Sequence, residues 1–239
     1  MSRTPRVRIT NRLIARLQRS DREHLLAGCE AVELRLGEVL YEPGERIRHV
    51  YFPGNGFVSL LTPRDGCTSL EVGLVGAEGV LGATVLLGVD ASPLRALVQG
   101  GGGAMRMESA PFVREFGHSA DLRRTLNSYL YVSLAQLART AACTHFHLLE
   151  ARLARWLLMT HDRAQADEFV LTHELLAQML GVRRVGVTKA AGALQRRKLI
   201  RYHRGRITVL ARAGLEAASC ACYRNGQDIY DRVMTVGRA

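Results

Sequence analysis

Ten Lys and Arg side chains fall between residues 175 and 215, and this stretch contains no Asp or Glu. Ordinary protein surface mixes both signs of charge, so cations without an intervening anion repel one another. The phosphates of a nucleic acid relieve such repulsion, and binding releases condensed counterions. The formal net charge of the whole chain, +11, has the same sign. The stretch therefore predicts a polyanionic partner, and we expect double-stranded DNA rather than a membrane surface.

The same stretch has the order of elements of a helix-turn-helix. A short helix over residues 174–180 is expected, then a turn at Gly181, then a second helix from Arg183 or Arg184 to about Arg197. Glycine permits the backbone of a tight turn. In this motif the first residues of the second helix reach base edges in the major groove. We therefore expect sequence-specific binding to DNA.

Two short strands are expected after the second helix. They cover residues 199–202 and 206–210, with Arg204 and Gly205 at the turn between them. A basic β-hairpin in this place is typical of a winged helix-turn-helix. The combination favours a DNA-binding domain. The alternative is a basic region that binds nonspecific nucleic acid or an anionic surface.

Individual side chains can be assigned roles at DNA. Arg184 and Lys189 lie near the start of the second helix, about one and a half turns apart, so both can point into the groove as base readers. The three cations at residues 196–198 either contact phosphate or form a solvated helix end. The side chains better placed for backbone phosphates are Thr172, His173, Arg183, Thr188, Arg204 and Arg206.

The N-terminal half has a different pattern. Between residues 32 and 107, short extended runs alternate with Gly and Pro, which predicts an all-β sandwich or barrel. A helical segment over residues 12–27 precedes it. The glycines at residues 100–103 predict a mobile turn or loop.

Near residue 119 the apolar period changes to steps of three and four residues, which predicts a long helix with one apolar face. A second helix is expected over residues 146–161. Residues 122–142 of the long helix span about 30 Å. This length is greater than a helix needs to cover one face of a small β domain. We expect part of its stripe to meet a second copy of the chain, and the alternative is packing within one subunit. The dimer residues are Leu126, Leu130, Leu134 and Leu137.

These features resemble the Crp/Fnr family of transcription regulators over nearly the whole chain. The resemblance is carried by the run GEVLYEPGE at residues 37–45, the strand 50–52 with Gly56, the run VGAEGVLG at residues 75–82 and the helix-turn-helix at 175–200. The long helix is similar to the dimerisation helix of that family.

The resemblance implies an α+β fold in three parts. An N-terminal helix and a cyclic-nucleotide-binding-type β jelly roll occupy residues 1–118, the dimerisation helix occupies 119–143, and a winged helix-turn-helix occupies 144–239. It also implies a cytoplasmic homodimer on a partly palindromic DNA site, with recognition helices about one DNA turn apart. A small-molecule effector at the jelly roll would adjust its affinity, and RNA polymerase is a further possible partner.

The sensor region departs from the family's cyclic-AMP pattern. Members that bind cyclic AMP have glycine followed by glutamate and, about ten residues on, arginine followed by a small hydroxyl residue. On the long helix, Leu137 and Ala138 stand where polar groups would bond adenine. We expect no cyclic AMP, whereas another anionic effector, a cyclic dinucleotide, or no ligand at all remains open. The residues in the corresponding pocket are Gly82, Ala83, Thr84, Ser92 and Arg95.

The recognition helix departs from the family as well. Members often have a glutamate just after the base-reading arginine, where this chain has Val185. A valine can touch a thymine methyl group instead of accepting a hydrogen bond from cytosine. We assign Val185 as a third base-reading residue and expect a different target sequence.

The sequence predicts neither a metal centre nor an enzyme. The pair Cys220 and Cys222 is too closely spaced and too isolated to be a metal site on its own, and His145 and His147 lack a third ligand. Motifs of hydrolases, P-loop proteins and paired-cysteine sites are missing. An apolar run of 18 residues is missing too. The cysteines form an odd, scattered set that argues against a disulfide framework: Cys29, Cys67, Cys143, Cys220 and Cys222.

Overall fold

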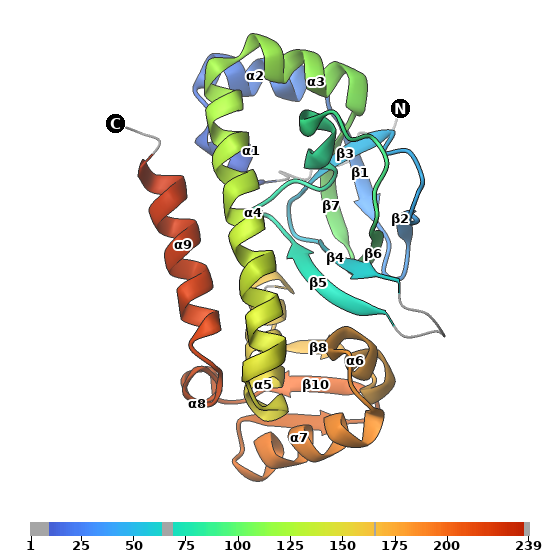
Figure 1. The fold of residues 1–239 in the computed structure, drawn as a ribbon, viewed down its shortest axis with the longest axis vertical. Coiled ribbons are helices and arrows are strands. Elements are labelled where there is room, and N and C mark those ends of the chain that lie inside the picture. The colour runs from blue at the N-terminus through green and yellow to red at the C-terminus, as the bar shows by residue number, and fades with distance from the viewer. Residues whose placement is uncertain (1–9, 64–68, 165, 237–239) are drawn as a thin grey trace, which may run out of the picture.

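The computed structural model describes residues 10–63, 69–164 and 166–236 of the chain. Two antiparallel sheets form its N-terminal part, a small domain of helices around a three-stranded sheet forms its C-terminal part, and a long helix runs beside both (Figure 1). Cys67 lies outside the described ranges. Within those ranges, the helices are too short or too polar to cross a membrane.

The N-terminal part is the expected jelly roll. One sheet has the order β1-β7-β3 and the other β2-β6-β4-β5. Apolar side chains of both sheets, among them Phe52, Val58 and Val98, meet in one buried core. The all-β interpretation of this region is confirmed. The strands are β1 (Glu30–Leu34), β2 (Val39–Tyr41), β3 (His49–Pro53), β4 (Phe57–Thr62), β5 (Leu70–Val75), β6 (Arg95–Gly100) and β7 (Gly102–Glu108), and a short 3-10 helix, η1 (Ala83–Leu87), follows β5.

The single helical segment expected over residues 12–27 is two helices. These are α1 (Arg12–Arg16) and α2 (Arg19–Ala27). Leu17 has an extended backbone, with ψ of 148°, and its side chain is buried in the N-terminal core. The chain therefore bends at Leu17, and the expectation of one continuous helix was wrong.

The glycines at residues 100–103, expected to form a mobile turn or loop, lie at a tight turn between a strand of one sheet and a strand of the other. Gly100 ends β6 and Gly102 begins β7. The backbone N–H of Gly103 donates to Asn55 Oδ1 at 2.7 Å. A Cβ atom on Gly102 would lie 2.7 Å from the backbone nitrogen of Gly56, which is too close for a side chain. The glycines thus allow two chain segments to approach closely, and the expected turn is confined to Gly101, between β6 and β7.

The long helix forms as expected. After α3 (Ser109–His118), α4 (Ala120–Phe146) spans about 40 Å. The Ser119 side chain caps its first turn by accepting a hydrogen bond from the Leu122 N–H at 2.9 Å. The N-terminal half of α4 covers the jelly roll, and its C-terminal end reaches the DNA-binding domain (Figure 1).

The C-terminal part has its own core. Residues His147 and Leu148 link α4 to α5, so the second helix begins at Leu149 rather than at the expected residue 146. Leu157, Leu176 and Leu194 are among the side chains buried in this core. A sheet of order β8-β10-β9 closes it. The elements are α5 (Leu149–Ala164), β8 (Glu168–Val170), α6 (His173–Leu180), α7 (Arg184–Arg196), β9 (Ile200–His203), β10 (Arg206–Val209) and α8 (Arg212–Ala218).

The last helix, α9 (Cys222–Val236), returns to the N-terminal part and packs along α4 (Figure 1). Tyr230 and Met234 join the jelly-roll core. The Tyr230 hydroxyl donates to the carbonyl of Glu78 at 2.9 Å. The range 144–239 expected for the DNA-binding domain therefore includes a helix that packs on the other part of the molecule.

Candidate nucleic-acid interface

Helices α6 and α7 and the turn between them form the expected helix-turn-helix. Thr172 caps α6, its hydroxyl accepting a hydrogen bond from the Leu175 N–H at 3.1 Å. Gly181 ends α6 in the left-handed region, with φ of 63°. Glycine adopts this conformation without the penalty that a Cβ atom brings. The turn then places the start of α7 beside α6. Leu176 and Leu180 are buried on the inner face of α6.

One face of α7 is buried and the other is exposed. Val187, Ala191 and Leu194 point into the core. At about 100° per residue, Arg184, Val185, Thr188 and Lys189 lie within an arc of about 140° on the opposite side. All four are exposed, and Val185 is 59% exposed. The three expected base readers therefore share a surface that is accessible to a DNA groove.

The wing follows α7 as expected. Strands β9 and β10 pair antiparallel, with Ile207 opposite Tyr202. The backbone N–H of Tyr202 donates to Gln195 Oε1 at 2.8 Å, which ties the wing to the end of the recognition helix. Arg204 lies at the exposed tip with a positive φ of 46°, beside Gly205.

The six residues expected to contact phosphate are not equivalent in the structure. Arg183 and Arg204 are exposed, beside α7 and at the wing tip. Arg206 is held by an ion pair with Glu168 at 2.7 Å. That carboxylate would compete with a phosphate for the same guanidinium. Arg183 and Arg204 are thus better suited to bind phosphate than Arg206.

His173 and Thr188 contact one another. The Thr188 hydroxyl lies 3.0 Å from His173 Nδ1 and donates to the carbonyl of Arg184 at 3.1 Å. The His173 ring stacks on Tyr202, with centroids 4.1 Å apart. Burial and the positive charge of Arg184 lower the pKa of His173. This shift favours the uncharged ring, which weakens the expected role of His173 as a phosphate ligand, and the stacking on Tyr202 suits a role in supporting the wing.

The residues proposed for an effector pocket do not form a cation-lined cavity. The Ser92 hydroxyl is used within its own turn, donating to the Leu94 carbonyl at 2.9 Å. Arg95 forms an ion pair with Glu42 at 3.1 Å. Gly82 and Ala83 are buried at the start of η1 while Thr84 is exposed. Ser92 Oγ and Arg95 Nη2 thus have partners within the jelly roll, whereas Arg95 Nε is buried without one among the described residues.

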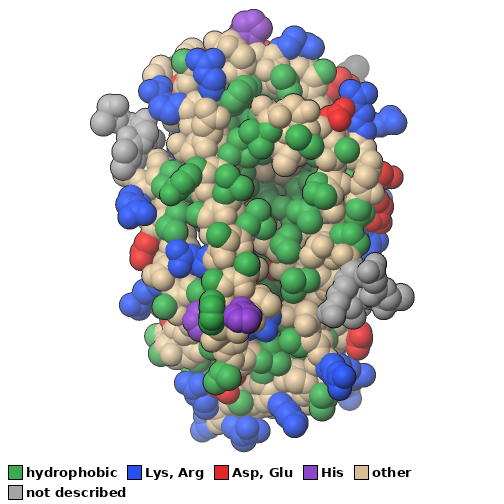
Figure 2. Space-filling view, in the orientation of Figure 1, with side chains coloured by type: hydrophobic (Ala, Val, Ile, Leu, Met, Phe, Trp, Pro, Cys, Tyr) green, Lys and Arg blue, Asp and Glu red, His purple; other side chains and the backbone are tan. Residues whose placement is uncertain are grey.

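The outer face of α4 carries exposed apolar side chains. Tyr131, Leu134 and Leu137 are 57%, 66% and 40% exposed. Figure 2 shows hydrophobic side chains gathered along the centre of this face of the molecule. In contrast, Leu126 is wholly buried in the N-terminal core and Leu130 is half-buried against it. The expectation that Leu126 faces a second copy is therefore wrong, because the first half of α4 serves its own subunit.

A cluster of cysteine and histidine side chains was missed. Cys220 and Cys222 do not stand alone, because Cys143 and His147 from the end of α4 lie beside them. His147, which with His145 was expected to lack a third ligand, thus has three cysteines beside it. Its spacing of four residues from Cys143 on a helix was the available signal, since such residues share one face. Their approach to Cys220 depends on the path of α9, which the sequence did not reveal.

Comparison with known proteins supports the fold and the motif. Residues 151–218 match the family described as the Crp-like helix-turn-helix domain. A search of curated proteins gave no match. The matched residues span α5 to α8 and include every residue assigned to DNA contact.

Solved structures of similar fold include proteins described as regulators. FixK2 from Bradyrhizobium japonicum has 17% identity and a TM-score of 0.68, over 81% of this chain and 98% of that chain. The c-di-GMP responsive global regulator CLP from Xanthomonas campestris has 18% identity and a TM-score of 0.63, over 80% and 99%. A CRP/FNR-family transcriptional regulator from Thermus thermophilus has 25% identity and a TM-score of 0.66, over 80% and 98%.

Proposed function

We propose that this chain, whose residues 151–218 match the Crp-like helix-turn-helix domain, is a DNA-binding transcription regulator of the Crp/Fnr family and that it acts in the cytoplasm as a homodimer on a partly palindromic DNA site. Regulators of this family are not enzymes, in agreement with the sequence-based expectation. The observation that carries the proposal is the exposed, acid-free face of α7, where Arg184, Val185 and Lys189 lie together.

We assign Arg184 and Lys189 to base edges, and Val185 to a thymine methyl group or another apolar edge. Arg183 and Arg204 hold the DNA backbone on either side. Two copies related by a two-fold axis would place the two α7 helices one DNA turn apart, which matches the spacing of palindromic half-sites.

We further propose that cyclic AMP is not the effector. The support is that Ser92 and Arg95 already have partners within the jelly roll. A different small molecule is compatible with the fold, and contact with RNA polymerase is a further part of the proposal. Calorimetric titration with cyclic AMP should therefore give no binding heat, and micromolar binding would overturn this point.

The DNA proposal is tested by selecting a binding site from random DNA and then measuring affinity for the Arg184→Ala variant. Arg184→Ala should lose about 1 to 3 kcal/mol on the selected site and discriminate less at one base position. The matched control is Arg35→Ala, which removes the same charge from an exposed residue outside the helix-turn-helix.

Two outcomes would count against the assignment. If Arg184→Ala weakened binding equally on all sequences, Arg184 would be a phosphate ligand. In the second outcome, selection returns no preferred sequence, and the affinity depends on salt concentration and not on DNA sequence. The basic surface would then bind nonspecifically, which is the alternative interpretation.

A further inference from the structure

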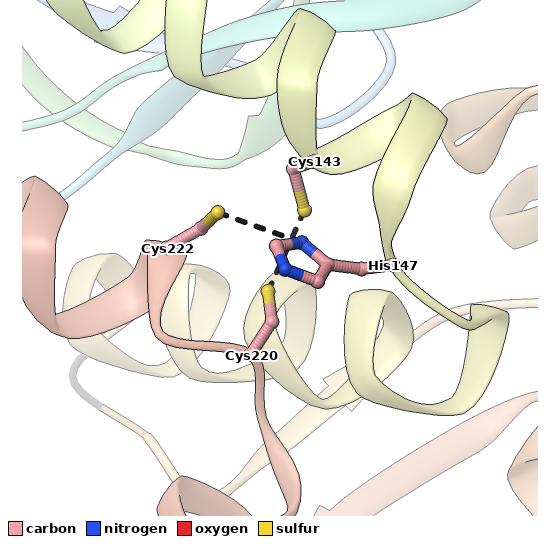
Figure 3. Close-up of side chains that lie close together, drawn as sticks. All are labelled: Cys143, His147, Cys220 and Cys222. Atoms are coloured by element: carbon pink, nitrogen blue, oxygen red, sulfur yellow. Dashed lines mark hydrogen bonds between the residues drawn. The ribbon is translucent and has the colours of Figure 1, made fainter.

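Four potential metal ligands meet where α4 ends and α9 begins (Figure 3). Cys143 lies in the last turn of α4, and His147 is the residue that ends this helix. Cys220 lies in the segment between α8 and α9, and Cys222 is the first residue of α9. Their sulfur and ring nitrogen atoms all lie within 4.8 Å of one another. Two segments distant in sequence thus contribute two ligand atoms each.

The spacings fit a single tetrahedral ion. The Cys143 and Cys220 sulfurs are 3.5 Å apart, and the Cys222 sulfur is 3.6 Å from His147 Nδ1. With zinc bonds of about 2.3 Å to sulfur and about 2.0 Å to nitrogen, tetrahedral geometry places two sulfurs about 3.8 Å apart and sulfur about 3.5 Å from nitrogen. Small shifts of the side chains would bring the four atoms to those positions.

Burial and charge also suit a metal centre. The three cysteines are at most 8% exposed and form a small cluster of their own, separate from both hydrophobic cores. Three thiolates and a neutral imidazole around a divalent ion leave one net negative charge. Arg155 Nη1 lies 4.0 Å from the Cys143 sulfur and can offset that charge. A guanidinium at this position is attracted to metal-bound thiolates, whereas uncharged thiols would attract it only weakly.

We propose that Cys143, His147, Cys220 and Cys222 bind one Zn²⁺ ion per chain in a closed structural site. Binding displaces the three thiol protons to solvent, while His147 coordinates as the neutral ring. A Cys₃His set without an open position is typical of structural rather than catalytic zinc. The proposal does not depend on the proposed DNA site, because metal binding is measured on the protein alone.

The position of the ion gives it a structural consequence. His147 and Leu148 form the whole link between α4 and α5. An ion held there would tie the end of α4 to the start of α9, at the junction of the DNA-binding domain with the rest of the chain. We therefore expect metal removal to loosen the junction and lower the midpoint of thermal unfolding.

The experiment uses the full chain purified under reducing conditions. Elemental analysis should find about one zinc per chain, and Co²⁺ in place of zinc should give the intense visible absorption of a tetrahedral thiolate complex. The variants Cys220→Ser with Cys222→Ser, and His147→Ala, should each weaken metal binding by at least tenfold. Matched controls are Cys29→Ser, a half-buried cysteine elsewhere, and His145→Ala, two residues from His147.

Circular dichroism of each variant separates loss of the ligand set from loss of the fold. A folded double-cysteine variant that keeps stoichiometric zinc would overturn the proposal. So would a wild-type chain that takes up neither Zn²⁺ nor Co²⁺ from a tenfold excess. A disulfide between Cys143 and Cys220, found by mass spectrometry in the protein as isolated and in place of the metal, would overturn it as well.

Discussion

Glu71 is a buried carboxyl group that joins the two parts of the molecule. It lies on β5, where Ser59 Oγ donates to Glu71 Oε2 at 2.6 Å and Trp156 Nε1 donates to Glu71 Oε1 at 2.7 Å. Burial raises the pKa of Glu71 from 4.5 to about 7, and these hydrogen bonds, with Arg163 and Arg155 on α5, partly oppose the rise. Trp156 belongs to the other core, so the carboxyl links β5 to α5.

This pKa predicts a pH dependence of stability. Between about pH 4.5 and 7 the folded chain keeps a proton on Glu71 that the unfolded chain has released. The free energy of unfolding should therefore fall as pH rises through this window. Glu71→Gln keeps a neutral group that can bond Trp156 and Ser59, so its thermal midpoint should fall less between pH 5 and 8. Glu33→Gln, an exposed carboxyl change on β1, is the control, and equal pH slopes for Glu71→Gln and wild type would contradict the prediction.

At the residue scale, the sequence was informative where side-chain position follows from local structure. Arg184 and Lys189 could be placed on the exposed face because the helix period and the apolar residues around them determine it. The internal partners of Arg206 and His173 could not be inferred, since Glu168 and Tyr202 reach them only through strand pairing. The contact of Cys143 with Cys220 was missed because they are 77 residues apart in the sequence and only the tertiary fold brings them together.

The turn of the helix-turn-helix depends on one glycine. Gly181 has φ of 63°, and a Cβ there would also lie 2.8 Å from the Leu70 Cδ1 atom. Gly181→Ala should therefore lower the free energy of unfolding by about 1 to 3 kcal/mol. Gly192→Ala is the matched control, because Gly192 lies within α7 and alanine there should stabilise by about 0.5 to 1 kcal/mol. Urea denaturation measures both, and equal stability of the two variants would show that the turn carries no such strain.

The wing should bind DNA without reading its sequence. Arg204 lies at the exposed tip between β9 and β10. Arg204→Ala should weaken binding about equally on specific and unrelated DNA and reduce the slope of log affinity against log salt by about 1. Affinities measured by fluorescence anisotropy at several salt concentrations would check this. A loss confined to the specific site would instead make Arg204 a base-reading residue.

At the element scale, boundaries marked by glycine or by a capping residue were predictable. Gly181 and Thr172 delimit α6 as expected. The break at Leu17 had no such signal, because leucine is a good helix former and only tertiary burial explains its extended backbone. The same limit applies to α9, whose apolar face is visible in the sequence but whose partner, α4, is not.

The whole molecule is held together along α4. Besides the contacts of α9, an ion pair of 2.6 Å joins Glu78 beside the jelly roll to Arg163 on α5, with both side chains largely buried. The DNA-binding domain is thus fixed to the jelly roll on the inner side of α4. The outer side of the same helix keeps Tyr131, Leu134 and Leu137 exposed. An exposed apolar stripe of this kind indicates an interaction surface. In a two-fold dimer the same stripe on α4 of a second chain would cover it.

The homodimer is tested by placing a charge in this stripe. Leu134 is 66% exposed in the single chain, so Leu134→Glu should leave the subunit folded. In a two-fold interface the two glutamates would lose water and lie near each other, which disfavours association. Light scattering should give the wild type twice the chain mass of 26.4 kDa and shift Leu134→Glu toward the single mass. Leu36→Glu is the control, since Leu36 is 63% exposed outside α4 and should leave the mass unchanged. A Leu134→Glu variant that keeps the wild-type mass would show that α4 does not form the interface.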